Sequence, residues 1–292
     1  MSEPVGPRAA APASRRAVRT AARKPGRAGR NLPAAIAVGA VLGALVLASL
    51  LVRKEAFVVV VAAAVCLALW ELTQALGQRG IAVPLVPVAV GAVAMLVAAF
   101  TAGGQALAVC FLLTAVGVVV WRTAEGPVDG LRDVAGGIFA AAYLPLLAGF
   151  AMLMLAEPDG ALRVLTFVLV TIASDIGGYA AGVLTGRHPM APSVSPKKSW
   201  EGFAGSAVTC VVVGVLAVVW LLDGPWWAGA LVGASAVLTA TLGDLGESMI
   251  KRDLGIKDMG SVLPGHGGLM DRLDSLVMTA PVCWVLLHML VR

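Results

Sequence analysis

The sequence predicts an all-α, polytopic integral membrane protein with about nine transmembrane helices, and three observations lead to this fold class. Hydrophobic residues make up 59% of the 292-residue chain, and the mean hydropathy is +0.90, far above that of a soluble domain. Only 13% of the residues are charged. The apolar residues form successive segments, each long enough to cross about 30 Å of hydrocarbon.

The apolar segments begin at Asn31, where Asn followed by Pro33 is typical of a helix start. They divide the chain into N-terminal transmembrane helices over 31–160 and a C-terminal transmembrane region over 161–292. We expect the helices near residues 32–52, 56–76, 81–100, 104–121, 134–156, 162–186, 203–222, 226–250 and 273–291.

Residues 1–30 form a separate tail with eight basic residues and a single acidic one, Glu3. Such a composition cannot bury a core, so we expect a disordered basic tail in the cytoplasm. Two roles stay open for it: attraction to anionic lipid headgroups, or a topology signal with no specific contact. Binding to nucleic acid is not expected, because the tail has no aromatic residue to stack on a base.

The basic residues of the predicted loops indicate the orientation of the chain in the membrane. The side opposite the tail holds only Arg53, Lys54 and Arg163, with Arg292 at the end. The side of the tail holds Arg79, Arg122, Arg132, Arg187, Lys197, Lys198, Lys251, Arg252, Lys257 and Arg272. By the positive-inside rule, the tail and the loops 187–202 and 251–272 are cytoplasmic. We therefore expect a multi-pass protein of the cell (plasma or inner) membrane.

One stretch, residues 243–275, carries far more charge than the rest of the chain. If residues 235–250 are helical, one polar stripe holds Asp244, Glu247, Ser248 and Lys251. The last apolar helix repeats that spacing with Asp271, Asp274 and Ser275. The connection between the helices holds Arg252, Lys257, Asp258 and the run Pro264-Gly265-His266-Gly267-Gly268. Carboxylates at two helix ends can hold a hard divalent cation, and Lys or Arg beside them can bind phosphate.

The predicted hairpin between the last two helices can bring Asp244 and Asp271 together. Water is scarce at both positions, so an unpaired carboxylate would be poorly solvated there. Mg²⁺ takes one or two carboxylates together with water and substrate oxygens. The sequence therefore predicts Mg²⁺ at Asp244 and Asp271, with Asp175 as a third acidic member, either in the same inner sphere or at a second cation.

A second polar region extends from Ser174 to Ser206. Asp175 lies inside an apolar span, which indicates either a functional site or a structural carboxylate bonded to a neighbouring helix. Lys197 and Lys198 precede a predicted helix start, where positive charge and free backbone N–H groups suit a polyphosphate. A plain positive-inside pair is the alternative for these lysines.

Both regions closely resemble the phosphatidate cytidylyltransferase (CDP-diglyceride synthase) family. The first region meets the family signature at Ser248, Lys251, Arg252, Lys257, Asp258, Pro264 to Gly268, Asp271, Arg272, Asp274 and Ser275. The second meets the family pattern at Ser174, Asp175, Tyr179, Ser195 to Lys198, Glu201 and Gly202. Ser199 replaces the commoner Thr, and Ser206 replaces a usual Gly. The first five spans match the family only in being apolar.

The resemblance implies the reaction of CTP with phosphatidate to give CDP-diacylglycerol and pyrophosphate, in phospholipid biosynthesis. Family members are often dimers, so the resemblance also makes a homodimer a candidate. The expected cofactor is Mg²⁺, and a second cation such as K⁺ stays open. The expected catalytic residues are Asp175, Lys197, Lys198, Asp244, Lys251, Arg252, Asp258, His266, Asp271 and Arg272. The expected substrate-binding residues are Ser195, Ser248, Lys257, Gly267, Gly268, Asp274 and Ser275.

Two other functions stay open. A CTP-dependent polyprenol or phytol kinase would also span the membrane, although the full run from Pro264 to Ser275 argues against it. A membrane ion transporter would use Asp175, Asp244 and Glu71 as an ion path, but it would not explain the paired cations on one face. For Glu71 itself, we expect a place in a lipid cleft, a pairing with a basic partner, or a side chain that snorkels to the interface.

Overall fold

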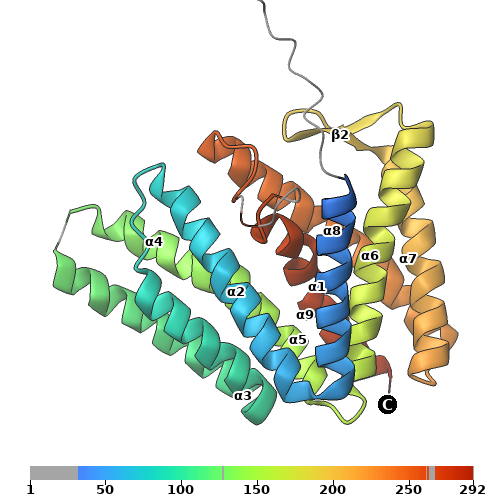
Figure 1. Ribbon diagram of the computed structural model, residues 1–292, viewed down its shortest axis with the longest axis horizontal. Helices are drawn as coiled ribbons and strands as arrows, with labels where there is room; N and C mark the ends of the chain where they lie inside the picture. The colour runs from blue at the N-terminus through green and yellow to red at the C-terminus, as the bar shows by residue number, and fades with distance from the viewer. Residues whose placement is uncertain (1–31, 127, 261, 263–266, 292) are drawn as a thin grey trace, which may run out of the picture.

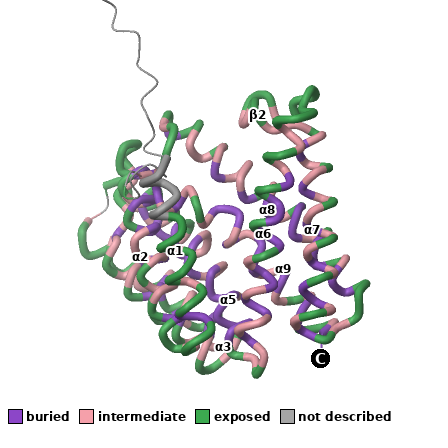
Figure 2. The backbone as a smooth tube through the Cα atoms, turned by 45° about the vertical axis from the view of Figure 1, so that its right-hand side comes forward, coloured by how far each residue is buried: buried purple, intermediate pink, exposed green. Residues whose placement is uncertain are grey.

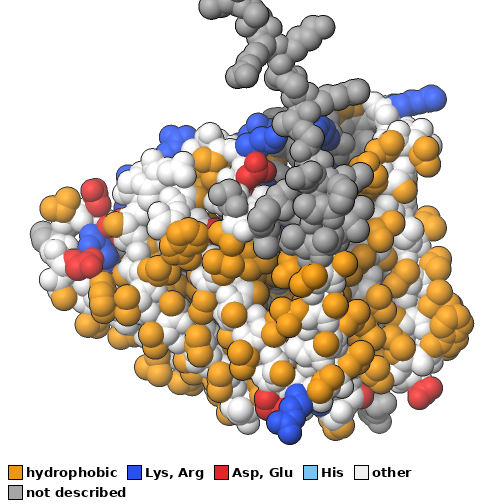
Figure 3. Space-filling model, viewed as in Figure 1, with side chains coloured by type: hydrophobic (Ala, Val, Ile, Leu, Met, Phe, Trp, Pro, Cys, Tyr) orange, Lys and Arg blue, Asp and Glu red, His pale blue; other side chains and the backbone are white. Residues whose placement is uncertain are grey.

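The computed structural model describes residues 32–126, 128–260, 262 and 267–291, with side chains from residue 39 onward. The predicted fold class is confirmed: the described chain is a bundle of long apolar helices. Seven of these helices are long and apolar enough to cross a membrane. Apolar side chains cover the middle of the visible face, and charged side chains gather at its two edges (Figure 3). The predicted tail, residues 1–30, lies outside the described residues.

The expected count of about nine crossings is not confirmed, and helix α3 explains part of the difference. Helices α1 (Leu32–Val52) and α2 (Lys54–Gly77) match predicted spans. Helix α3 (Leu85–Glu125) covers two predicted spans in one element, with a non-helical Gly103 at φ 82° inside it. A Cβ on Gly91 would lie 2.1 Å from Thr114 Oγ1, so the two halves of α3 fold back on each other.

The next crossing is assembled from three pieces. Helix α4 (Gly130–Ala141) continues into a short π-helix (Ala142–Leu146) and then α5 (Leu147–Ala156). Pro145 lies in the π-helical turn. Proline has no N–H to donate, so the backbone bonding pattern has to change around it. Together these pieces form the single predicted span of residues 134–156.

The C-terminal half forms an antiparallel series of four long helices (Figure 1). These are α6 (Gly160–Thr185), α7 (Trp200–Leu221), α8 (Trp226–Leu254) and α9 (Met270–Leu290). Between α6 and α7, where a loop was predicted, two short antiparallel strands form a hairpin, β1 (Pro189–Ala191) and β2 (Ser195–Ser199). This hairpin is the one departure from an all-α fold among the described residues.

Glycines allow the helices of this half to pack closely. A Cβ on Gly205 of α7 would lie 2.3 Å from Ala181 Cβ and 2.7 Å from the Gly177 carbonyl of α6. Between α7 and α8, a Cβ on Gly214 would lie 2.4 Å from the Gly229 carbonyl. Without side chains in the way, the helix backbones approach to van der Waals contact. This packing fixes α8 relative to the hairpin that follows α6.

One buried cluster extends through both halves of the chain (Figure 2). Leu69 and Leu72 of α2 are fully buried, as are Met95 of α3 and Met270 of α9. At the edge away from the hairpin, Arg163 of α6 donates to the carbonyls of Leu287 and Val291 at 2.9 and 3.0 Å. Because one cluster includes side chains of α2, α3 and α9, the N-terminal helices pack against α9, which carries part of the family signature.

The two edges of the bundle carry different segments (Figure 1). The hairpin 189–199, the end of α8 and the start of α9 share one edge. The turn from α5 to α6, residues 157–159, lies at the other. The cytoplasmic placement of the hairpin edge stays a prediction, and it can be tested by labelling.

We predict that Ser193→Cys reacts with a membrane-impermeant maleimide in inside-out vesicles and not in intact cells. Pro158→Cys should show the opposite pattern, because both residues are exposed and they lie at opposite edges. The background must lack Cys66, Cys110, Cys210 and Cys283. Labelling of Ser193→Cys from outside intact cells would contradict the predicted orientation.

Candidate active site

Two cavities meet at the hairpin edge of the bundle, and Lys198 and Asp244 line both. The first, of about 250 Å³, lies between α6, the hairpin and α7, and Asp175, Tyr179, Lys197 and Phe203 also line it. The second, of about 700 Å³, lies between α8, α9 and the segment that joins them. Its other lining residues are Glu247, Ser248, Lys251, Lys257, Asp258, Gly267, Asp271, Arg272 and Asp274.

Lys198 lies in strand β2 of the hairpin, at the junction of the two cavities. Its ammonium donates to Asp244 Oδ2 on α8. The next residue, Ser199, is the N-cap of α7, and its Oγ accepts the Gly202 N–H at 3.1 Å. That N–H is therefore already bonded, which weakens the hypothesis that free amides at this helix start hold a polyphosphate. The lysine side chain is the group that faces the cavities.

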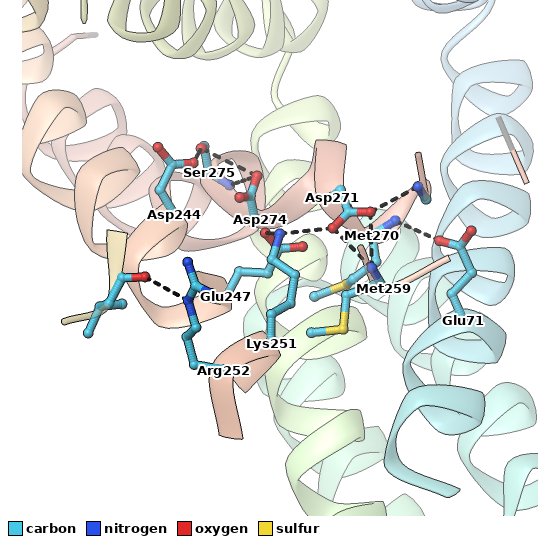
Figure 4. A network of polar contacts seen from close by, with 12 residues as sticks. Glu71, Asp244, Glu247, Lys251, Arg252, Met259, Met270, Asp271, Asp274 and Ser275 are labelled. Carbon is cyan, nitrogen blue, oxygen red and sulfur yellow. Dashed lines mark hydrogen bonds and ion pairs between the residues drawn. The ribbon is translucent and has the colours of Figure 1, made fainter. Parts of the chain in front are cut away.

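Three acidic side chains lie close together beside Lys198. The Ser275 hydroxyl is 2.8 Å from Asp244 Oδ1 and 3.4 Å from Asp274 Oδ1, so it lies between the two carboxylates (Figure 4). Asp274 is only 7% exposed. Among the described side chains, Glu247 Oε1 is buried without a hydrogen-bond partner. Carboxylates gathered with so little water repel one another unless a cation is near.

Asp271, at the start of α9, also lines the larger cavity, and it bonds groups from three segments of the chain. Its Oδ1 accepts from Lys251 Nζ at 2.9 Å, and its Oδ2 accepts from the Gly268 N–H at 2.9 Å. The Met259 N–H lies 3.2 Å from both oxygens. Lys251 also donates to Glu247 Oε2 at 2.5 Å (Figure 4). The carboxylate thus joins α8, α9 and the segment between them.

These contacts bear on the predicted Mg²⁺ site. In the described part of the chain, Asp175, Asp244 and Asp271 do not form a group of three ligands for one ion. Asp244 has carboxylate neighbours that favour a cation, but its Oδ1 already accepts from the Ser275 hydroxyl and its Oδ2 from the Lys198 ammonium. Both oxygens of Asp271 are likewise engaged by donors. A carboxylate oxygen offers about two acceptor sites, so an ion at Asp271 would have to displace a donor, and Lys251 is the charged one.

Of the remaining predicted site residues that the structure describes, Ser195, Arg252 and Gly268 line neither cavity. Arg252 points to the hairpin, where its Nε donates to the Val194 carbonyl at 3.3 Å (Figure 4). Ser195 lies in β2 and pairs with Ala191. Gly268 contributes its N–H to Asp271. His266 lies outside the described residues.

Glu71 of α2 was singled out in the sequence only as a polar residue in an apolar span. Its side chain is 1% exposed, so the snorkelling interpretation is wrong. Its Oε2 accepts the Met270 N–H of α9 at 2.9 Å, next to Asp271 (Figure 4). An acidic residue in an apolar segment was the available signal, but its partner lies 199 positions further along the chain.

The fold and the site define a multi-pass membrane protein with a strongly charged site at one edge of its apolar band. The chain belongs to the cytidylyltransferase family, whose model matches residues 33–290. The predicted family membership is thereby confirmed.

Curated relatives agree over most of the chain. A phosphatidate cytidylyltransferase of Mycobacterium leprae is 42% identical over 303 residues, covering 96% of this chain and 95% of that protein. One from Mycobacterium bovis is 40% identical over 277 residues, covering 90% of each. A phosphatidate cytidylyltransferase of Synechocystis is 45% identical over 128 residues, covering 41% of this chain and 43% of that protein.

We predict that Gly205→Ala lowers the free energy of unfolding by about 1–3 kcal/mol, because the new methyl group overlaps Ala181 and the Gly177 carbonyl. The melting temperature in detergent measures the change. Gly246→Ala is the matched control, since its Cβ would meet no atom within 4 Å, and we expect it to be as stable as the parent or more so. Equal stability of Gly205→Ala and the parent would contradict the close approach of α6 and α7.

Proposed function

We propose that this protein is a phosphatidate cytidylyltransferase, which converts CTP and phosphatidate to CDP-diacylglycerol and pyrophosphate in phospholipid biosynthesis. The observation that carries the proposal is the pair of cavities that share Lys198 and Asp244. A reaction between two phosphate compounds needs two binding places that meet at one charged junction. The relatives that match nearly the whole chain support the same activity.

We assign the CTP triphosphate to the larger cavity. Four cationic side chains line it, and the volume of about 700 Å³ leaves room for a nucleotide. These cations are Lys198, Lys251, Lys257 and Arg272. The smaller cavity suits the phosphatidate headgroup, because exposed Tyr179 and half-buried Phe203 place apolar surface beside Lys197 and Lys198. Lipid then reaches the junction from the bilayer, and CTP reaches it from water.

In the proposed reaction, a phosphate oxygen of phosphatidate attacks the α-phosphorus of CTP. The bond from that phosphorus to the bridging oxygen breaks, and pyrophosphate leaves with the electron pair. Both reactants are anions, so charge repulsion is a large part of the barrier, and fixed cations lower it. A phosphate monoester is largely ionised at pH 7, so no strong base is required to generate the attacking oxygen.

The lysines and arginine have distinct places in this scheme. Lys198 stands at the junction, where it can contact the phosphates of both substrates. Lys251 is held by Glu247 and Asp271 at 2.5 and 2.9 Å, which fixes its ammonium at the wall of the larger cavity. Arg272 lines the same cavity and can form a two-pronged contact with a phosphate.

We further propose that Mg²⁺ binds at this site through Asp244 and Asp271, with Asp175 as a third acidic member or as the ligand of a second cation such as K⁺. The crowding of Asp244, Asp274 and Glu247 supports a cation at Asp244. At Asp271, an ion would take the place of the Lys251 ammonium and leave that lysine available to phosphate. When bound, Mg²⁺ supplies an electrophilic contact to the phosphates.

The two rival functions fit this site less well. A lipid-alcohol kinase transfers a phosphoryl group to a neutral hydroxyl, and such an acceptor gives no reason for Lys197 and Lys198 in the smaller cavity. In an ion transporter, the acidic residues should follow a path through the bilayer. Here Asp175 and Asp244 line cavities that meet at the hairpin edge of the bundle, and Glu71 lines neither cavity.

The setting of the enzyme is also part of the proposal. We place it in the cell membrane with the hairpin edge in the cytoplasm, where CTP is available, and we retain the homodimer as an expectation from the family. The opposite orientation would leave the larger cavity without access to cytoplasmic nucleotide.

The purified protein should release pyrophosphate from CTP only when phosphatidate is present, and a neutral polyprenol or phytol should not replace it. Lys198→Met should lower kcat/KM by roughly 10²-fold or more, because a charge partner at a shielded site is poorly replaced by water. The control is Lys54→Met, whose ammonium donates to the Glu157 carbonyl at the other edge and whose loss should leave turnover unchanged. Full activity of Lys198→Met would contradict a shared junction.

Asp244→Asn and Asp271→Asn should each abolish turnover while the protein stays folded and membrane-inserted, and excess Mg²⁺ should restore little. Asp253→Asn removes an exposed carboxylate from the same end of α8 and should remain active. Turnover measured over a range of Mg²⁺ concentrations tests whether each aspartate is a metal ligand. Near-parental activity of either aspartate variant at low Mg²⁺ would remove that residue from the metal site.

A further inference from the structure

Helix α2 and the residues that follow it contact both ends of the connection between α8 and α9, of which residues 255–260, 262 and 267–269 are described. At the first end, Arg79 follows α2 and donates from Nη2 to the Asp253 carbonyl at 2.5 Å and from Nε to the Leu254 carbonyl at 3.3 Å. These are among the last carbonyls of α8, which have no partner within the helix. Gly255 ends the helix in a left-handed conformation at φ 71°.

At the second end, Glu71 holds the start of α9. Its Oε2 accepts the Met270 N–H at 2.9 Å, one of the helix amides that lack an intrahelical partner. Its carboxylate also lies directly against the connection: a Cβ on Gly260 would be 2.1 Å from Oε1, and one on Gly268 would be 2.8 Å from Oε2. The buried carboxylate therefore lies against the connection at both Gly260 and Gly268 and bonds the start of α9 through Oε2, whereas Oε1 has no hydrogen-bond partner among the described residues.

The groups that Glu71 touches are neighbours of those that hold Asp271. Asp271 follows Met270, and it accepts the N–H groups of Met259 and Gly268. Movement of the connection by even a short distance would alter these bonds and the Lys251–Asp271 ion pair that depends on the same carboxylate. Neither Glu71 nor Arg79 lines either cavity. Their effect on substrates is therefore indirect.

We propose that Glu71 and Arg79 are positioning residues, through which α2 fixes the connection so that Lys251 and Asp271 face the larger cavity. A carboxylate in an apolar span is costly, and an apolar residue would pack as well there if only stability were at stake. The proposal assigns a role in the site to an N-terminal helix that lies outside the two regions of signature residues. The proposal is tested in two ways. The kinetic test depends on the proposed function, whereas the structural test does not.

The structural test is amide hydrogen exchange of the full-length protein in detergent, without substrate. Glu71→Leu should speed exchange of peptides covering residues 255–260 and 267–272 by roughly tenfold, because the connection loses its support. Glu71→Gln keeps an acceptor oxygen and should stay close to the parent. Gln74→Leu removes an exposed polar side chain from the same helix and is the matched control. Unchanged exchange in Glu71→Leu would overturn the proposal whether or not the protein turns over CTP.

The kinetic test compares kcat and KM for CTP in the same variants. Glu71→Leu and Arg79→Met should each lower kcat by roughly 10- to 10²-fold through misplacement of the charged groups. Glu71→Gln should recover most of this loss. The double variant should lose less than the product of the single losses, because both residues hold one connection. Parental kcat in both single variants would overturn the positioning role. It would also be overturned if the loss of activity were fully explained by a smaller amount of folded protein, with kcat per folded molecule unchanged.

Discussion

The carboxylate of Asp271 is the contact on which the site depends. It bonds Lys251 of α8 and the N–H groups of Met259 and Gly268. At the edge of a bilayer, water is too scarce to satisfy such a group, so it has to find donors within the protein. The polar segment between α8 and α9 therefore folds around one side chain, and the same requirement keeps Lys251 at the wall of the cavity.

Close helix packing provides the other half of the site. Gly177 and Gly205 bring α6 against α7, and Gly214 and Gly229 bring α7 against α8. Asp175 and Asp244 then line one cavity, and the β-hairpin places Lys198 between them and the larger cavity. Small residues in the membrane thus determine where the charged residues at its edge meet.

Much of this could be predicted from sequence. Apolar segments gave the fold class, and the dense charges of residues 243–275 indicated the site. The two halves of α3 were predicted as separate spans, 81–100 and 104–121, but their contact, Gly91 against Thr114, is visible only in three dimensions. The strands at 189–199 are too short for a clear pattern. Glu71 could be noticed but not assigned, since its meaning depends on a partner in α9.

The central claim, transfer of a cytidylyl group to a lipid phosphate, is tested most directly by the position of the label in CTP. The protein, supplied with phosphatidate, is given CTP labelled at either the α- or the γ-phosphorus. The account predicts that the α-label enters the lipid and that the γ-label leaves in pyrophosphate. Entry of the γ-label into lipid would contradict cytidylyl transfer and identify a kinase instead.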